Sequence, residues 1–237
     1  MSACVLTPPP TDRQAFDALG YAGPFALSRV DHVEAIVGQW GKLRQRPRNR
    51  HADTPEILTV FNDTALLEQL RRISDARFVL WRTNFFGKGL DARTMGEIGW
   101  HHDKHFQDGA SDLDFTEIGA HLSVLIAMKD MTLENGAFEV LPGSHRPMPG
   151  LQRDTRPFYL GPPKCHYVDM PTALEAQRVQ FALKQGEFML FHSALVHRSL
   201  PFSAGLPRIS MTGRFARTDI VIPEAVANDN PSAPLAM

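Results

Sequence analysis

The feature that most constrains the fold is a series of short, strand-like segments in the last two thirds of the chain. From Ala76 onward, segments rich in aromatic and β-branched residues alternate with glycine, proline and asparagine, a pattern typical of β-strands joined by turns. These segments are ARFVLWRTNFF, HLSVLIAMKDM, GAFEVLP, RVQFAL, GEFMLFHSAL and RISMTGRFA. They predict a barrel or sandwich that packs against helices formed by the preceding residues.

The first third of the chain is predicted to be helical. One helix runs from a cap at Thr11-Asp12 to Gly20, which ends it. A second, over Val30 to Leu43, has its apolar residues at helical intervals, and a third follows the capping residues Asn62-Asp63-Thr64. The expected fold class is therefore mainly β with N-terminal helices.

The length of 237 residues suits one sizeable core, and barrels of this size are routinely single domains. We expect residues 1–237 to form one domain. The prolines at 8–10 indicate an extended, flexible lead-in over 1–10. The small and polar residues after Pro223 predict a flexible tail over 224–237.

Charge and apolar patterning narrow the range of partners. The net charge is −1 without a basic stripe, so no nucleic-acid partner is expected. No apolar run approaches the roughly 20 residues of a membrane span, and the first residues lack the pattern of a secretory signal. Cys4 and Cys165 form neither a disulfide framework nor a zinc motif. We expect a cytoplasmic protein with no membrane partner.

The segment from Gly99 to His105 (GWHHDKH) carries the first metal-binding signal. Side chains two residues apart on a strand lie on one face, so His101 and Asp103 point together and His102 points away. An imidazole and a carboxylate supply two of the three ligands of a 2-His-1-carboxylate Fe(II) site. A histidine on a later predicted strand, His197, can supply the third.

An HxD triplet alone recurs by chance, and His102, His105 and His192 are competing candidates. A His-rich loop with a hydrogen-bonded core histidine is therefore an open alternative. Arg208 favours the metal site, because it follows His197 by eleven residues on the next predicted strand. Its guanidinium could hold a small dicarboxylate whose keto-acid end chelates the iron.

The order and spacing of these motifs resemble the phytanoyl-CoA dioxygenase family of Fe(II)/2-oxoglutarate-dependent oxygenases, from about Phe78 to Arg217. Three blocks carry the resemblance. The first, Trp100-His101-His102-Asp103, matches the WHxD of the family. The second joins Glu134-Asn135-Gly136 to Leu141-Pro142-Gly143-Ser144-His145-Arg146 and is similar to the NG and PGSH turn of the family, and the third, which matches its GD, H and R ending, consists of Gly186-Glu187-Phe188, His197-Arg198-Ser199 and Arg208.

The resemblance implies a double-stranded β-helix, a jelly-roll or cupin-like barrel with the iron inside one mouth. It implies that His101, Asp103 and His197 are the iron ligands and the catalytic centre. It also implies that Arg208, helped by Ser199, binds the distal carboxylate of 2-oxoglutarate, with O2 as the co-substrate.

The stretch from Leu80 to Phe86 (LWRTNFF) resembles the WRTxFF stretch of the syringomycin-type non-haem iron halogenases. Those enzymes replace the carboxylate ligand by a small residue, which opens a coordination site for chloride. Because Asp103 is retained here, the resemblance implies hydroxylation. Arg214 falls where the halogenases carry a second active-site arginine, although a structural salt bridge explains it nearly as well. Asn84 and His105 are further candidates for substrate binding.

The sequence thus predicts a dioxygenase that hydroxylates an unactivated C–H bond of a small polar molecule, an amino acid or derivative, and releases succinate and CO2. Loop cations at 93, 104, 146 and 153 could bind a substrate carboxylate, and the 87–99, 107–114 and 145–177 segments are lid candidates. Two alternatives stay open. One is an oxygenase of a carrier-protein-tethered acyl group, with the carrier protein as partner. The other is a cupin-type protein that binds a metal or ligand without redox turnover. Desaturation and epimerisation would use the same iron site.

Overall fold

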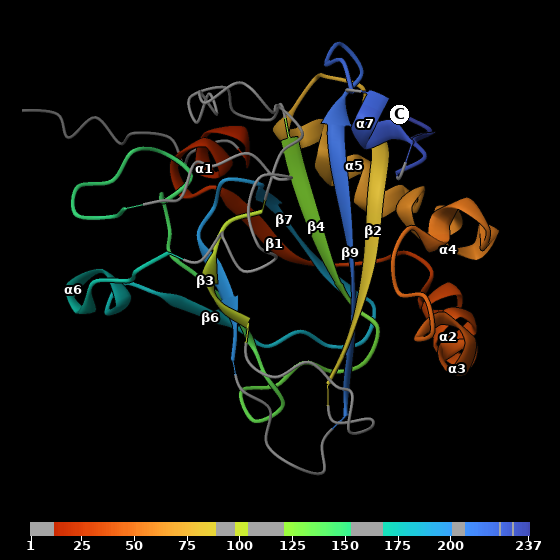
Figure 1. Cartoon of the computed structure of the whole chain (residues 1–237), viewed down its shortest axis with the longest axis horizontal. Helices are drawn as coiled ribbons and strands as arrows, with labels where there is room; N and C mark the ends of the chain where they lie inside the picture. Colours follow the sequence, from red (N-terminus) through yellow and green to blue (C-terminus); the bar gives the residue numbers. More distant parts are fainter. Residues whose placement is uncertain are drawn as a thin grey trace, which may run out of the picture.

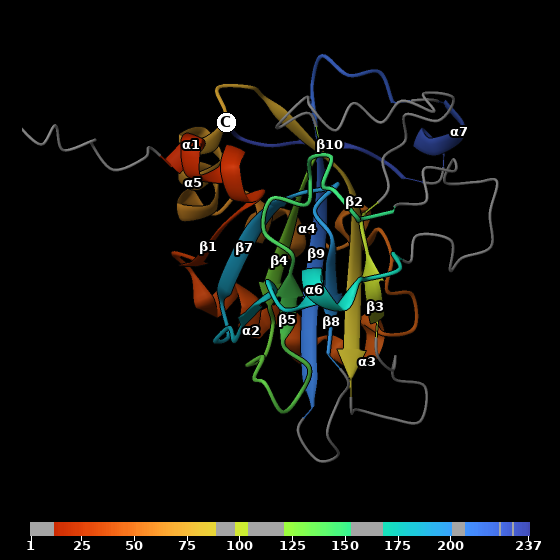
Figure 2. The same cartoon turned by 90° about the vertical axis from the view of Figure 1, so that its left-hand side faces the viewer.

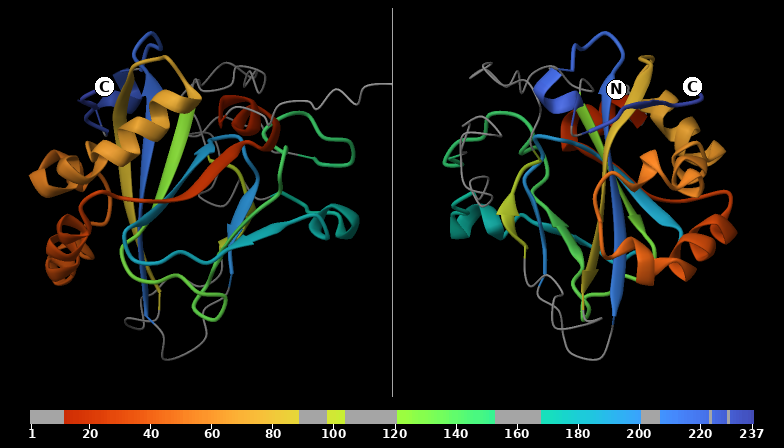
Figure 3. Two further views of the ribbon diagram at one scale, coloured as in Figure 1. Left: turned by 180° about the vertical axis from the view of Figure 1, so that it is seen from behind. Right: turned by 45° about the vertical axis from the view of Figure 1, so that its right-hand side comes forward.

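Two antiparallel sheets face one another in the computed structural model, which describes residues 12–88, 98–103, 121–152, 168–200, 207–222, 224–228 and 230–237. The larger sheet has the strand order β1-β7-β4-β9-β2-β10, and the smaller sheet has the order β3-β8-β5-β6. Figure 2, seen from the side of the smaller sheet, shows β5 and β8 in front of β4 and β9. Helices α2 to α5 lie on the outer face of the larger sheet (Figure 1 and, in orange, Figure 3).

The strands of the larger sheet are β1 (Tyr21–Ala26), β2 (Phe78–Lys88), β4 (His121–Ala127), β7 (Glu187–His192), β9 (Arg208–Arg217) and β10 (Ala233–Pro234). Those of the smaller sheet are β3 (Ile98–His101), β5 (Phe138–Val140), β6 (Val179–Phe181) and β8 (His197–Ser199). The helices are α1 (Asp12–Leu19), α2 (Val30–Gly38), α3 (Trp40–Leu43), α4 (Pro55–Phe61), α5 (Thr64–Ile73), α6 (Thr172–Glu175) and α7 (Glu224–Ala227), with a 3-10 turn η1 (Arg50–Ala52).

Two of the predicted helix ends are confirmed by the local contacts. Asp63 caps α5, because its carboxylate accepts a hydrogen bond from the backbone N–H of Ala65 at 2.9 Å. The same carboxylate also accepts from the backbone N–H groups of Ser28 and Arg29, so one residue joins the start of α5 to the segment that precedes α2. Gly20 ends α1 with a φ of +81°, where a Cβ would lie 2.4 Å from the His145 ring.

Two apolar clusters hold the layers together. The larger cluster fills the space between the helices and the larger sheet and includes Phe61, Leu66 and Phe215. The smaller cluster lies between the two sheets and includes Leu125, Phe138 and Met189. Burial of a side chain of this size contributes about 1.5–3 kcal/mol.

The inner face of the larger sheet changes from apolar to polar from β7 across β4 to β9. Leu125 of β4 has Met189 of β7 on one side and Thr212 of β9 on the other. The polar residues therefore gather where β9 and β2 face the smaller sheet.

A β-bulge in β2 decides which of its residues face inward. The register with β9 runs Leu80↔Phe215 and then Arg82↔Arg214, so Trp81 is the extra residue. Before the bulge, Leu80 packs in the core beneath the helices. After it, Thr83 bonds to His51 on the helix side, so Arg82 faces the barrel interior with Arg214.

The structure departs from the sequence expectations in several places. The helix expected over Val30 to Leu43 is divided into α2 and α3 at Gln39. Residues 21–26, within the third predicted to be helical, form strand β1, which pairs with β7. The tail over 224–237 is predicted to be flexible, whereas in the structure β10 pairs with the edge of β2 and Leu235 packs in the larger core. The bond from the His51 ring to the Pro231 carbonyl, 2.7 Å long, also fixes this segment. The lead-in over 1–10 lies outside the described residues.

In the part of the chain that the structure describes, no helix is both long and apolar enough to cross a membrane.

Candidate active site

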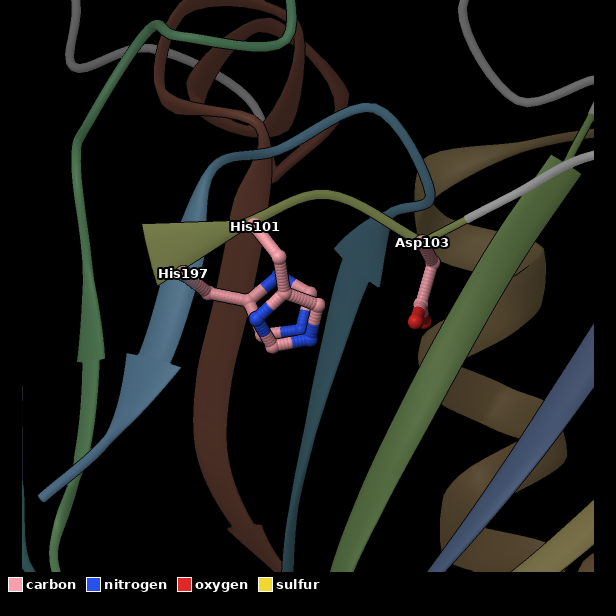
Figure 4. A group of neighbouring side chains, drawn as sticks. All are labelled: His101, Asp103 and His197. Carbon is pink, nitrogen blue, oxygen red and sulfur yellow. The ribbon is translucent and has the colours of Figure 1, made fainter. Parts of the chain in front are cut away.

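His101 and His197 are direct cross-strand partners at the junction of β3 and β8. His101 is the last residue of β3 and His197 the first of β8, and their ring centroids lie 4.2 Å apart. Asp103 lies two residues beyond the end of β3, and Figure 4 shows its carboxylate beside the two imidazoles. One potential ligand atom from each residue falls within 4.8 Å of the others. The structure thus brings the three predicted iron ligands together.

Backbone carbonyls orient both imidazoles. The Nδ1–H of His101 donates to the carbonyl of Gly99 at 2.8 Å, and the Nδ1–H of His197 donates to that of Leu195 at 2.8 Å. Each bond fixes the tautomer and leaves Nε2 unprotonated as a metal donor. In both residues the ring bonds to the backbone carbonyl two residues earlier in the chain, and this contact holds the two imidazoles in place before any metal binds.

Two side chains fix the Asp103 carboxylate. The hydroxyl of Ser123, on β4, donates to Oδ2 at 2.7 Å, and the guanidinium of Arg214, on β9, donates to Oδ1 at 2.5 Å. Burial alone would raise the pKa of Asp103. The positive charge of Arg214, the two histidines and the Ser123 hydrogen bond outweigh burial and hold this pKa well below its usual range.

The protonation states suit a divalent metal. Burial, helped by the charge of His197, lowers the pKa of His101 to about 3, and burial also lowers the pKa of His197. At neutral pH the group therefore offers two neutral imidazoles and one carboxylate, which are the forms that bind metal. Imidazole and carboxylate donors with positions left open are the donor set of non-haem Fe(II).

Arg208 is a buried cation at the start of β9, six residues before Arg214. It is 3% exposed, and its Nη1 donates to the Gly136 carbonyl and to the Ser199 hydroxyl, while Nη2 donates to the Ser210 hydroxyl at 3.2 Å. Its Nε has no hydrogen-bond acceptor, and within the described ranges no carboxylate pairs with it. Burial lowers its pKa to about 10, which leaves it charged at neutral pH. A buried charge of this kind calls for an anion.

Arg208 and Arg214 lie on opposite sides of the candidate metal ligands. Residues of β9 at even numbers share the inner face, so the two arginines point to the same interior from positions six residues apart. At about 3.3 Å per residue that separation is about 20 Å along the strand. Arg208 contacts Ser199, two residues beyond His197, and Arg214 contacts Asp103, so the candidate metal position lies between them.

The remaining candidate residues divide into three groups. His192 and His145 have structural places: the His192 Nδ1 accepts from the backbone N–H of Ala194, and the His145 ring donates to the Asp17 carbonyl. Asn84 is buried on the inner face opposite Thr212 of β9. His105, with the loop cations at 93, 104 and 153 and the 107–114 segment, lies outside the described residues.

Ser123 and Arg82 escaped the sequence analysis. Ser123 lies within the apolar run from Leu122 to Ala127, and Arg82 directly follows the apolar run from Phe78 to Trp81. A polar residue within or beside an apolar run was the signal that the sequence offered for each of them. Their roles depend on neighbouring strands, which the pattern alone does not place.

The sequence analysis also did not predict a charged network beside His101 and His197. Glu139 of β5 is fully buried and pairs with Arg198, the residue after His197, and with Arg178 at 3.0 Å. The guanidinium of Arg198 lies 4.5 Å above the ring of Trp100, the residue before His101. This network ties β3 to β8 on the side away from the metal ligands, and its charges are far apart in the sequence.

The sequence model of the phytanoyl-CoA dioxygenase family (PhyH) matches residues 22–210, which is most of the chain. The chain belongs to the phytanoyl-CoA dioxygenase family. The resemblance seen in the motifs is thereby confirmed, and within this family the chain is a 2-oxoglutarate-dependent oxygenase. A comparison with curated protein sequences gives no match.

Solved structures support the same fold for this member of the phytanoyl-CoA dioxygenase family. The non-heme alpha ketoglutarate dependent carbocyclase SnoK from nogalamycin biosynthesis is 18% identical, with a TM-score of 0.68 over 98% of this chain and 97% of that one. EctD from S. alaskensis, solved with 2-oxoglutarate and 5-hydroxyectoine, is 22% identical, with a TM-score of 0.63 over 88% of this chain and 76% of EctD. CytC3 with Fe(II) and alpha-ketoglutarate is 20% identical, with a TM-score of 0.60 over 90% and 79% of the two chains. The predicted double-stranded β-helix is confirmed.

Proposed function

We propose that the protein is an Fe(II)- and 2-oxoglutarate-dependent hydroxylase that acts on a C–H bond of a small polar molecule, an amino acid or derivative. The observation that carries this proposal is Arg208. It is a buried cation on β9 that faces the same interior as the candidate iron ligands, and its Nε finds no acceptor among the described residues. The distal carboxylate of 2-oxoglutarate would satisfy this charge.

In this proposal His101, Asp103 and His197 hold Fe(II), and Arg208 with Ser199 holds 2-oxoglutarate. When bound, Fe(II) and 2-oxoglutarate supply the oxidising power with O2, which converts 2-oxoglutarate into succinate and CO2 and delivers one oxygen atom to the substrate C–H bond. Asp103 favours hydroxylation, because its carboxylate would occupy the coordination position that chloride would need. Ser123 and Arg214 keep its carboxylate ionised and oriented.

The polarity of the interior supports a polar substrate. On the side of Asp103, the inner face carries Asn84, Thr212 and Arg214, whereas the apolar part of the interior lies toward β7. A polar molecule could place its hydrogen-bonding groups on the β2–β9 side.

The direct test measures metal binding and turnover separately. Fe(II) should bind with one-to-one stoichiometry under nitrogen, and this binding should be lost in His101→Ala. The matched control is His32→Ala, which changes a histidine on α2 remote from the ligand group. With Fe(II), 2-oxoglutarate and O2, a panel of amino acids should include members that stimulate succinate release.

Absence of Fe(II) binding would refute the metal centre. Binding without turnover of any substrate would favour the non-redox alternative, and turnover only with a carrier-protein-tethered acyl group would select the carrier-dependent one.

A further inference from the structure

The outer face of the smaller sheet carries a row of polar side chains beside the candidate metal ligands. Gln180 of β6 lies opposite Glu139 of β5, and Glu139 lies opposite Arg198 of β8. The neighbours of Glu139 along β5 pack between the two sheets, so this row faces outward. Arg198 directly follows His197, and it therefore lies on the face opposite to the one that carries the candidate metal ligands.

The row continues into a β-bulge of β3, just before His101. In this bulge Gly99 and Trp100 together lie opposite Arg198. The Gly99 carbonyl accepts the hydrogen bond from the Nδ1–H of His101 at 2.8 Å. The Trp100 carbonyl instead accepts from the backbone N–H of Val168, also at 2.8 Å. The shape of the bulge therefore decides where the His101 ring points.

Arg198 holds the bulge from the outer face. Its guanidinium lies 4.5 Å from the centroid of the Trp100 ring, and its Nε donates to the completely buried carboxylate of Glu139. Its Nη1 pairs at 2.9 Å with Glu175 of α6, a helix that Figure 2 shows in front of the smaller sheet. The same Glu175 oxygen accepts from the Trp100 Nε1–H at 3.5 Å. These four residues, here called the outer clamp, hold the guanidinium and the indole against each other.

The outer clamp is joined through the backbone to both candidate histidine ligands. Trp100 directly precedes His101, and Arg198 directly follows His197. The His197 ring, however, is oriented by the carbonyl of Leu195, which is not part of the bulge. Loss of the outer clamp should therefore disturb His101 more than His197.

We propose that Arg198 is a positioning residue for the metal site. By stacking on Trp100, it keeps the bulge in the shape that directs the Gly99 carbonyl to the Nδ1–H of His101. This inference rests on the proposed function, since it concerns the metal ligands of that same site. Without the stack, the indole and the bulge gain freedom and the hydrogen bond behind His101 weakens. The imidazole is then no longer held ready for the metal.

The test is metal binding by Arg198→Gln, measured under nitrogen against a competing chelator, with Co(II) in place of Fe(II). Co(II) accepts the same donor atoms, and its visible absorption bands change with the positions of its ligands. Loss of a direct partner of a metal ligand typically costs about 10- to 100-fold in metal affinity, and Arg198 acts one contact further away, so we expect a loss of about fivefold. The visible spectrum per bound ion should also change, which a loss of stability alone would not cause.

The matched control is Arg178→Gln. Arg178 pairs with the same Glu139 carboxylate at 3.0 Å, and in the described part of the chain its other contact is the Glu175 carbonyl. This variant should lower stability while the Co(II) affinity and spectrum stay as in the wild type. If Arg198→Gln fails to fold, Arg198→Lys carries the test, because an ammonium can pair with Glu139 but lacks the flat face that stacks on Trp100. It should show the same change of spectrum.

Wild-type Co(II) affinity and spectrum in every folded Arg198 variant would overturn the inference. An equal loss of affinity in Arg198→Gln and Arg178→Gln would also overturn it, because the effect would then be one of stability. The proposed function fails differently: a wild-type protein that shows the expected variant effects, but converts no 2-oxoglutarate with any substrate, would refute the hydroxylase and leave the inference standing. A wild-type protein that binds neither Co(II) nor Fe(II) would overturn both.

Discussion

Removal of one hydroxyl, in Ser123→Ala, should weaken Fe(II) binding without unfolding the protein. The Ser123 Oγ is completely buried and donates to Oδ2 of Asp103 at 2.7 Å. A hydrogen bond to a charged group contributes about 1.5–3 kcal/mol, and loss of such a partner of a metal ligand typically costs about 10- to 100-fold in metal affinity. Arg214 still holds the other carboxylate oxygen in the variant. We therefore expect the lower part of this range, about tenfold.

The matched control is Ser193→Ala. Ser193 is buried beside Ser123, with the two Oγ atoms 3.4 Å apart, but it does not contact Asp103. The two variants remove the same atom from the same neighbourhood, so cavity effects are alike. Dissociation constants for Fe(II), measured under nitrogen against a competing chelator, should differ between them by about the full tenfold. Equal constants for the two variants would refute the reasoning that Asp103 depends on Ser123.

Four further outcomes are expected. Arg208→Lys should raise the KM for 2-oxoglutarate at least tenfold, because an ammonium lacks the paired donors of a guanidinium; an unchanged KM would remove Arg208 from the cofactor site. Asp103→Gly should abolish hydroxylation, as read by substrate-dependent succinate release, and a variant that hydroxylates at the wild-type rate would show that the triad is wrongly assigned. The metal-free protein should lose stability as the pH falls from about 6.5 toward 4, because the unfolded chain takes up protons at histidines whose pKa values burial depresses in the folded state, to about 3 for His101 and about 4 for His121; a Tm, measured by circular dichroism, that is flat over this range would contradict it. Glu139→Gln should lower the free energy of unfolding by about 2 kcal/mol in urea titrations, because it removes the buried carboxylate that accepts hydrogen bonds from Arg198 and Arg178, while Arg198 keeps Glu175 as a partner; a change below about 1 kcal/mol would mean that the network carries little stability.

The cluster of His101 and Asp103 could be predicted because their spacing is a local property. Alternation on an extended segment places His101 and Asp103 on one side, and the structure shows this arrangement although Asp103 lies beyond the end of β3. The choice of His197 over His192 came from the position of Arg208. The structure places His197 beside His101 and Asp103, whereas His192 bonds to the backbone of Ala194.

The parts of the site that could not be predicted depend on contacts between distant strands. Ser123 meets Asp103 from β4, and Arg214 meets it from β9. No periodicity within either strand reveals that partner. Strand β1 was missed for a similar reason, since Gly23 and Pro24 within it are turn signals locally, and its pairing with β7 overrides them.

The bulge at Trp81 makes the inward position of Arg82 depend on the number of residues in β2 as well as on their type. If the same residues paired with β9 without a bulge, the alternation would continue from Leu80, and the Arg82 side chain would lie among the helices. Deletion of Trp81 alone should leave Arg82 inward, because Arg82 would then directly follow the outward Leu80 and still pair with Arg214. Among relatives, an arginine that directly follows the outward apolar residue in a strand without the bulge, or that stands one residue later in a strand with the bulge, would face inward.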